Sequence, residues 1–76
     1  MDIKGHLSYK KLFKLLIDRN LKKKDLCQMA NVSTSSVTKL CYDQHVNTEI
    51  LERICYALEC DISDIAEYVD ERNYER

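Results

Sequence analysis

The segment from Lys22 to Leu40 constrains the fold of this chain more than any other. Leu26 and Ala30 are four residues apart, and Val37 and Leu40 are three apart. These spacings put each apolar pair on one face of a helix. The segment therefore predicts two short helices over residues 24–30 and 34–41, each burying one face.

The three residues between these helices predict a tight turn. Asn31 can adopt the left-handed backbone that such a turn needs, Val32 can fill the space between the helices, and Ser33 can cap the second helix. Two helices held at a fixed angle by a short turn form a helix-turn-helix, in which one helix braces the second in the DNA major groove.

Two motifs follow one another in register along most of the chain. They are Leu26-Cys27-x-x-Ala30-Asn31-Val32-Ser33-x-x-x-Val37-x-x-Leu40, and Thr48-Glu49-x-Leu51-Glu52-Arg53-Ile54-Cys55-x-Ala57-Leu58 continued by Asp61-Ile62-x-Asp64-Ile65. Together they resemble the Cro/C1-type (XRE) helix-turn-helix family over residues 9 to 69. The resemblance implies an all-α domain over residues 1–69, a compact five-helix bundle of the lambda-repressor-like type with the helix-turn-helix as helices two and three. Residues 70–76 are then a charged tail.

The remaining helices are expected on either side of this motif. We predict a first helix over about residues 8–19 with Ser8 as its cap, and a fourth that Asn47 or Thr48 caps and that closes at Glu59 and Cys60. A fifth helix is expected to start at Asp61 or Ser63. Its apolar side is formed by Ile62, Ile65, Ala66, Tyr68 and Val69.

Charge is distributed unevenly along the chain, although the net charge is only −1. Residues 1–45 carry nine Lys or Arg against four Asp or Glu, and residues 46–76 carry three against nine. This polarity favours a basic face toward a polyanion such as double-stranded DNA, with an acidic end held away from it. Solvated helix surfaces are the alternative explanation of the same pattern.

The second helix of the motif carries the candidate base-contacting residues. The resemblance implies that its first residues contact base edges, and its face opposite Val37 and Leu40 holds Thr34, Ser35, Thr38 and Lys39. Many relatives have Gln at the position of Thr34. Its absence predicts weaker base discrimination, or more reliance on DNA shape.

Candidate phosphate-contacting residues flank both helices of the motif. The start of the first helix favours an anion through its N–H groups and dipole, and the family commonly holds a phosphate there. The candidates are Lys22, Lys23 and Lys24 before that helix, and Tyr42, Gln44, His45 and Asn47 after the second.

A single helix-turn-helix seldom binds DNA tightly alone, so we expect a homodimer with two recognition helices about 34 Å apart. The candidate interface is the C-terminal apolar set, Ile65, Tyr68, Val69 and Tyr74. The alternative is that these side chains complete the core of one chain.

Other functions have little support in the sequence. The cysteines, Cys27, Cys41, Cys55 and Cys60, match no zinc or redox spacing, and a role as small apolar residues in a reducing cytoplasm is expected for them. Cys41 and His45 are the nearest approach to a catalytic pair, without a group to orient them. No signal peptide, membrane span, cofactor, metal or small-molecule site is predicted.

The sequence thus predicts a cytoplasmic, non-enzymatic transcriptional regulator, and a repressor in particular. The alternative is an antitoxin-like or adaptor module of the same fold, whose acidic half binds a basic protein and whose DNA binding is weak or absent.

Overall fold

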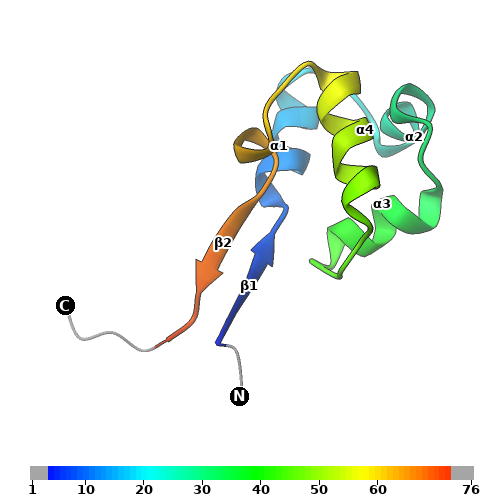
Figure 1. The fold of residues 1–76 in the computed structure, drawn as a ribbon. Coiled ribbons are helices and arrows are strands. Elements are labelled where there is room, and N and C mark those ends of the chain that lie inside the picture. The colour runs from blue at the N-terminus through cyan, green and yellow to red at the C-terminus, as the bar shows by residue number, and fades with distance from the viewer. Residues whose placement is uncertain (1–3, 73–76) are drawn as a thin grey trace.

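The computed structural model describes residues 4–72, and short loops connect its helices and strands. Four α-helices form a body from which a two-stranded ribbon projects (Figure 1). Among residues 4–72, no helix has the length and apolar character needed to cross a membrane. In chain order the elements are β1 (Gly5–Ser8), α1 (Lys10–Asp18), α2 (Lys23–Ala30), α3 (Thr34–Cys41), α4 (Thr48–Leu58), the 3-10 turn η1 (Ile62–Asp64) and β2 (Glu67–Asp70).

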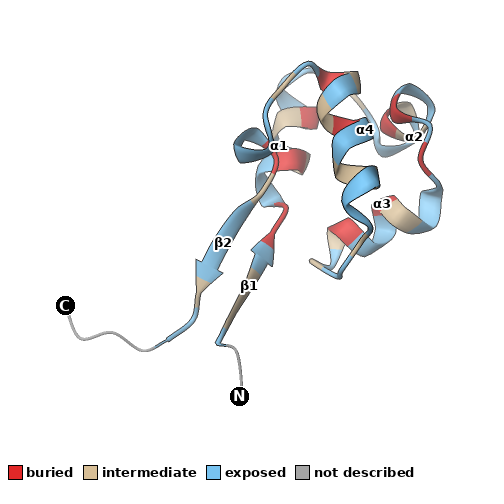
Figure 2. Cartoon of the chain, in the orientation of Figure 1, coloured by how far each residue is buried: buried red, intermediate tan, exposed pale blue. Residues whose placement is uncertain are grey.

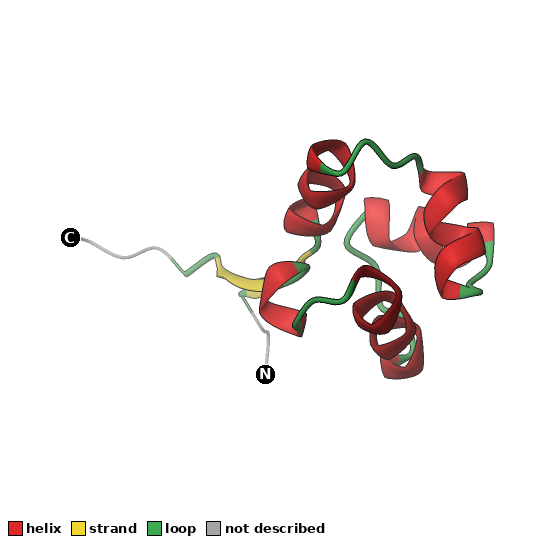
Figure 3. Ribbon diagram, turned by 90° about the horizontal axis from the view of Figure 1, so that it is seen from above, coloured by secondary structure: helices red, strands yellow, loops and turns green. Residues whose placement is uncertain are grey.

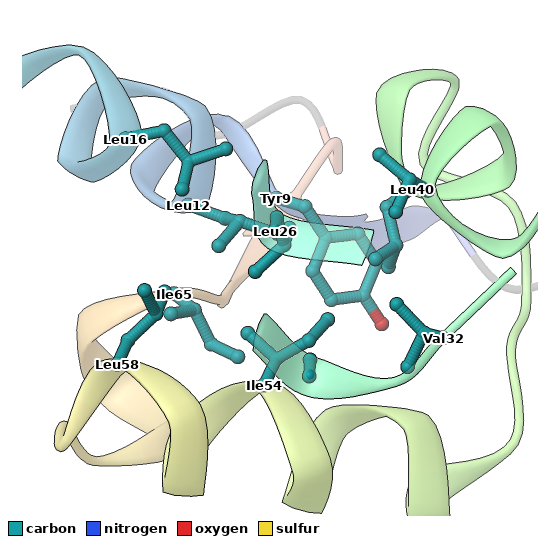
Figure 4. Packing of buried hydrophobic residues seen from close by; sticks show 11 residues of the cluster. Tyr9, Leu12, Leu16, Leu26, Val32, Leu40, Ile54, Leu58 and Ile65 are labelled. Carbon is teal, nitrogen blue, oxygen red and sulfur yellow. The ribbon is translucent and has the colours of Figure 1, made fainter. Parts of the chain in front are cut away.

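One hydrophobic core lies between the helices, which are arranged around it when viewed from above (Figure 3). Each helix contributes a pair of buried side chains at helical spacing, and Figure 4 shows most of them converging with Tyr9, Val32 and Ile65. Because full burial of one such side chain contributes about 1.5–3 kcal/mol, this cluster dominates the stability of the body. The four pairs are Leu12 and Leu16, Leu26 and Ala30, Val37 and Leu40, and Ile54 and Leu58.

The expected all-α bundle with five helices is wrong at its C-terminal end. The predicted fifth helix is replaced by η1 and by β2, which pairs antiparallel with β1 in the register Leu7 opposite Tyr68. Of the apolar set that suggested a helix, only Ile65 is fully buried, and Tyr68 and Val69 are exposed. Residues 67–70 therefore have no core to bury a helical face against, and their aromatic and β-branched side chains suit a strand once β1 supplies a partner.

The start of α1 also differs from expectation. Ser8 ends β1 and is buried, and the helix begins at Lys10. The Ser8 Oγ accepts the N–H of Lys10 at 3.4 Å, but from the position before Tyr9, which is the N-cap residue. The backbone N–H of Tyr9 donates to Oδ1 of Asp43, in the loop after α3, at 3.0 Å. This contact joins residues 34 positions apart, which no local pattern reveals.

Helix α4 begins and ends much as predicted. Asn47 caps it by accepting the N–H of Glu49 at 2.9 Å, and Glu59 closes it in a left-handed conformation with φ 52°. Asp61 then caps η1 through Ser63, and hydrogen bonds from the hydroxyl and N–H of Ser63 lower the pKa of Asp61.

The buried phenol of Tyr9 predicts that the protein loses stability in alkali. Burial, and then the charge of Asp43, raise the pKa of Tyr9 above its ordinary value. As pH rises past about 10, the Tyr9 phenol loses its proton in the unfolded chain before it does so in the folded protein. The free energy of unfolding is therefore highest below that pH and decreases as pH rises toward the pKa of Tyr9 in the folded protein. Urea unfolding at pH 8 and pH 10.5 should show a smaller loss in Tyr9→Phe than in the wild type. Tyr56→Phe, at an 87% exposed position, is the matched control. An equal loss in all three proteins would rule out this origin.

Candidate nucleic-acid interface

The turn between α2 and α3 has the conformation that its residues predict. Asn31 is left-handed, with φ 54° and ψ 50°, and Val32 is 8% exposed, between the two helices. Ser33 caps α3, since its Oγ accepts the N–H of Ser36 at 3.1 Å. The angle between the two helices is therefore fixed by a backbone turn, an apolar plug and a cap.

Loss of this cap should destabilise the domain. Ser33→Ala leaves the first turn of α3 without its side-chain acceptor, and we expect the free energy of unfolding to fall by about 1 kcal/mol. Ser33→Thr keeps an acceptor oxygen at the same place and should recover most of the loss. Urea denaturation followed by circular dichroism measures both, and an alanine variant as stable as the wild type would contradict the capping role.

Helix α3 buries Val37 and Leu40 and exposes the four predicted base-contacting residues, as the burial colouring in Figure 2 shows for the helix as a whole. The Thr38 hydroxyl donates to the carbonyl of Thr34 at 3.0 Å, so toward solvent it offers acceptor lone pairs and a methyl group. The Ser35 hydroxyl shares a 3.0 Å hydrogen bond with Ser33. Within residues 4–72 the side chains of Thr34 and Lys39 make no hydrogen bond or ion pair, so both are available to a ligand.

The three lysines at the start of α2 are exposed. Lys23 Nζ lies 5.6 Å from the centroid of the Phe13 ring, a cation–π contact that holds it beside α1. Asp25 accepts the N–H of Lys22 at 2.8 Å, a role that its position three residues into the helix could have indicated. This carboxylate occupies part of the anion-binding end of the helix, so the lysine side chains carry more of any phosphate contact there.

The loop after α3 exposes Tyr42, Gln44, His45 and Asn47. Between them Asp43 is left-handed, with φ 54°, and is held from the ribbon side by His6, whose Nε2 lies 3.4 Å from Oδ2 of Asp43. The other ring nitrogen, Nδ1, lies 3.1 Å from Glu71. His6, which no sequence pattern singles out, thus connects the ribbon to the loop that follows α3.

Arg53 lies in the second motif, but the motif does not reveal its role in supporting the α2–α3 turn. Its Nη1 donates to the carbonyl of Asn31 at 2.9 Å, and its Nη2 pairs with Glu49 at 2.8 Å. It therefore fastens the α2–α3 turn to α4. The spacing of Glu49 and Arg53 predicts the ion pair, but only the tertiary fold brings the Asn31 carbonyl to the guanidinium.

The predicted dimer residues separate into two groups. Ile65 has no exposed surface and completes the core of one chain, which removes it from the candidate interface. On the ribbon, Tyr68 is 54% exposed, Val69 36% and Leu7 45%. Tyr74 lies outside the described residues. Gly5 is required beneath Tyr68, because a Cβ there would collide with the phenol and with the Val69 carbonyl.

These features define a helix-turn-helix domain with an exposed hydroxyl-bearing recognition helix. Residues 11–71 match the model of the Cro/C1-type helix-turn-helix DNA-binding domain, and the chain belongs to this family. It is similar to the crystal structure of the transcriptional regulator VanUg (form II), with 41% identity and a TM-score of 0.84, over 92% of this chain and 93% of that one. No curated protein sequence matches the chain.

Proposed function

We propose that this protein is a transcriptional regulator that binds a specific double-stranded DNA sequence through α3 and represses by occupying a promoter. The observation that carries the proposal is the exposed face of α3, presented at an angle fixed by the Asn31 turn and the Ser33 cap. The likeness over nearly the whole chain to VanUg, described as a transcriptional regulator, supports it.

The residues divide between base and phosphate contacts. Thr34 and Ser35 lie at the start of α3 and suit the nearest base edges, while Thr38 and Lys39 lie further along the groove. The Thr38 methyl fits a thymine methyl, and Lys39 can donate to guanine or to a phosphate. Backbone contacts are assigned to the lysines before α2 and to the loop after α3, namely Lys22, Lys23, Lys24, Tyr42, Gln44, His45 and Asn47.

We assign homodimerisation to the ribbon. Leu7 lies opposite Tyr68 in the register, so an apolar pair shares one face of a two-stranded sheet whose outer edges have no strand partner within residues 4–72. Unpaired strand edges readily accept another strand. A Leu7→Lys/Tyr68→Lys variant changes both side chains of this face and is expected to sediment as a monomer at concentrations where the wild type is a dimer. Val69→Lys tests the opposite face, where Val69 pairs with His6, and a wild-type monomer would refute the assignment.

Selection of random-sequence DNA at about 0.1 M salt, followed by sequencing, tests the function directly. A twofold dimer predicts enrichment of a palindrome with half-sites about one helical turn apart. Enrichment of single half-sites would support sequence-specific binding and contradict the proposed dimer. No enrichment of any sequence would contradict the proposed function as a transcriptional regulator.

An adaptor that binds a basic protein remains the second candidate. This candidate is favoured by Glu49 and Glu52 of α4, which line one surface depression together with Tyr56 and Met29. Tyr56 is 87% exposed and Met29 48%. The two functions predict opposite sensitivities, because an adaptor should tolerate glutamate at Lys23, Lys24 and Lys39, and a regulator should not.

A further inference from the structure

Cys55 and Cys60 lie beside each other where α4 ends. The left-handed residue Glu59 reverses the chain, and the N–H of Cys60 donates to the carbonyl of Cys55 at 3.0 Å. This six-to-one hydrogen bond is the Schellman arrangement, in which the side chains of the two bonded residues commonly touch. The two thiols are thus brought together by the signal that stops the helix.

The backbone geometry suits a covalent bond between them. The 3.0 Å hydrogen bond, added to standard bond lengths, limits the separation of the two Cα atoms to about 7 Å. Disulfides span Cα separations of about 4.4–6.8 Å. The left-handed turn therefore holds the two residues within, or at the edge of, the range that needs little backbone movement.

Small reagents can reach both thiols. Cys55 and Cys60 are each half-buried and line one surface groove of about 460 Å³, together with Leu51 and Ile62. Burial raises the pKa of both thiols, whereas the neighbouring Cys60 lowers that of Cys55. Oxidation should therefore be slow at neutral pH and faster in mild alkali, because the thiolate is the reacting form.

We propose that Cys55 and Cys60 form a thiol-oxidation site that a low-molecular-weight disulfide closes into an intramolecular disulfide. One thiolate attacks a sulfur of the oxidant, forming a mixed disulfide and releasing one small thiol. The second thiolate attacks the protein sulfur of that mixed disulfide and releases the other small thiol. Two protein thiols are oxidised, one small disulfide is reduced, and the two protons pass to the released thiolates.

The bond would tie the last turn of α4 to the segment that leads into η1 and β2. That segment is the chain connection between the helix-turn-helix body and the second strand of the ribbon. Closing a short loop restricts the unfolded chain, so the oxidised protein should melt at a temperature higher by about 5–15 °C. None of this depends on DNA binding.

Trypsin separates the relevant cysteines without any mutation. Cleavage after Arg53 and Arg72 leaves Cys55 and Cys60 on one peptide, and cleavage after Lys39 puts Cys41 on another. The reduced full chain is treated with oxidised glutathione at pH 8, and the remaining thiols are blocked with N-ethylmaleimide. The protein is then digested with trypsin, and the peptide masses are measured by mass spectrometry. The expected product is the peptide of residues 54–72 lighter by two hydrogen atoms and carrying no adduct.

Cys60→Ser is the matched control and should accumulate glutathione on Cys55. Concentrated urea is the second control, since the ratio of closed to mixed disulfide should be higher in the folded protein. Two adducts on the wild-type peptide, an equal ratio in urea, or a lower melting temperature after closure would each overturn the proposal.

Discussion

Glutamate at both Lys23 and Lys39 should weaken binding to the selected DNA by at least about 60-fold at 0.1 M salt. Affinity depends on salt concentration to a power of about −0.9 per neutralised phosphate, so one contact contributes a factor of about 8 under these conditions. When Lys39 donates to a phosphate, as Lys23 is proposed to do, the two lost contacts multiply to that figure, and the repulsion between new carboxylates and phosphates adds to it. The slope of log affinity against log salt should also decrease by about 1 to 2.

The same change of net charge elsewhere separates a contact from a general charge effect. Lys10→Glu/Lys14→Glu alters two exposed residues of α1 that are assigned no DNA contact. Lys11 is left in place because its Nζ donates to the Ser63 carbonyl at 3.0 Å. Fluorescence anisotropy should show a loss of less than about 5-fold for this control, as expected from long-range potential alone. Equal losses in the two variants would show that Lys23 and Lys39 are not at the interface.

The helix-turn-helix could be predicted from sequence because its determinants are local. Asn31, Val32 and Ser33 act within one or two residues of the turn, and the bounds of α3 follow from one cap and one apolar pair. Helix α4 follows for the same reason, from Asn47 and an apolar stripe. In these elements, propensity, capping and burial favour the same structure.

The ribbon could not be predicted because its partners are far apart in sequence. Residues 67–70 have helix-compatible apolar spacing, and only pairing with residues 5–8 makes them a strand. The contacts of Asp43 with Tyr9 and of Arg53 with Asn31 span 34 and 22 residues. The candidate DNA-contacting side chains could be assigned from sequence alone, but the residues that hold them in position could not.

Replacing Leu40 with alanine should cost about 2–5 kcal/mol of the free energy of unfolding. Leu40 has no exposed surface and lies on α3, packed against the core beneath the recognition face. Truncation removes buried methyl groups and leaves a cavity that the surrounding helices fill only in part. A domain of this size has a total stability of about 4–11 kcal/mol, so the loss is a large fraction of the whole.

Tyr42→Ala, two residues further along, isolates this effect, because its side chain is 73% exposed. Its free energy of unfolding should change by less than about 0.5 kcal/mol.

DNA-binding affinity, measured on the folded form of each variant, should separate a loss of stability from a loss of a DNA contact. Leu40→Ala should bind DNA normally once cooling or a stabilising osmolyte refolds it, since it removes no contact. Tyr42→Ala should stay folded and bind more weakly, since it removes a side chain that we propose contacts a phosphate. If the refolded Leu40→Ala protein did not bind DNA, the Leu40 side chain would be needed to orient α3 for binding as well as to stabilise the fold.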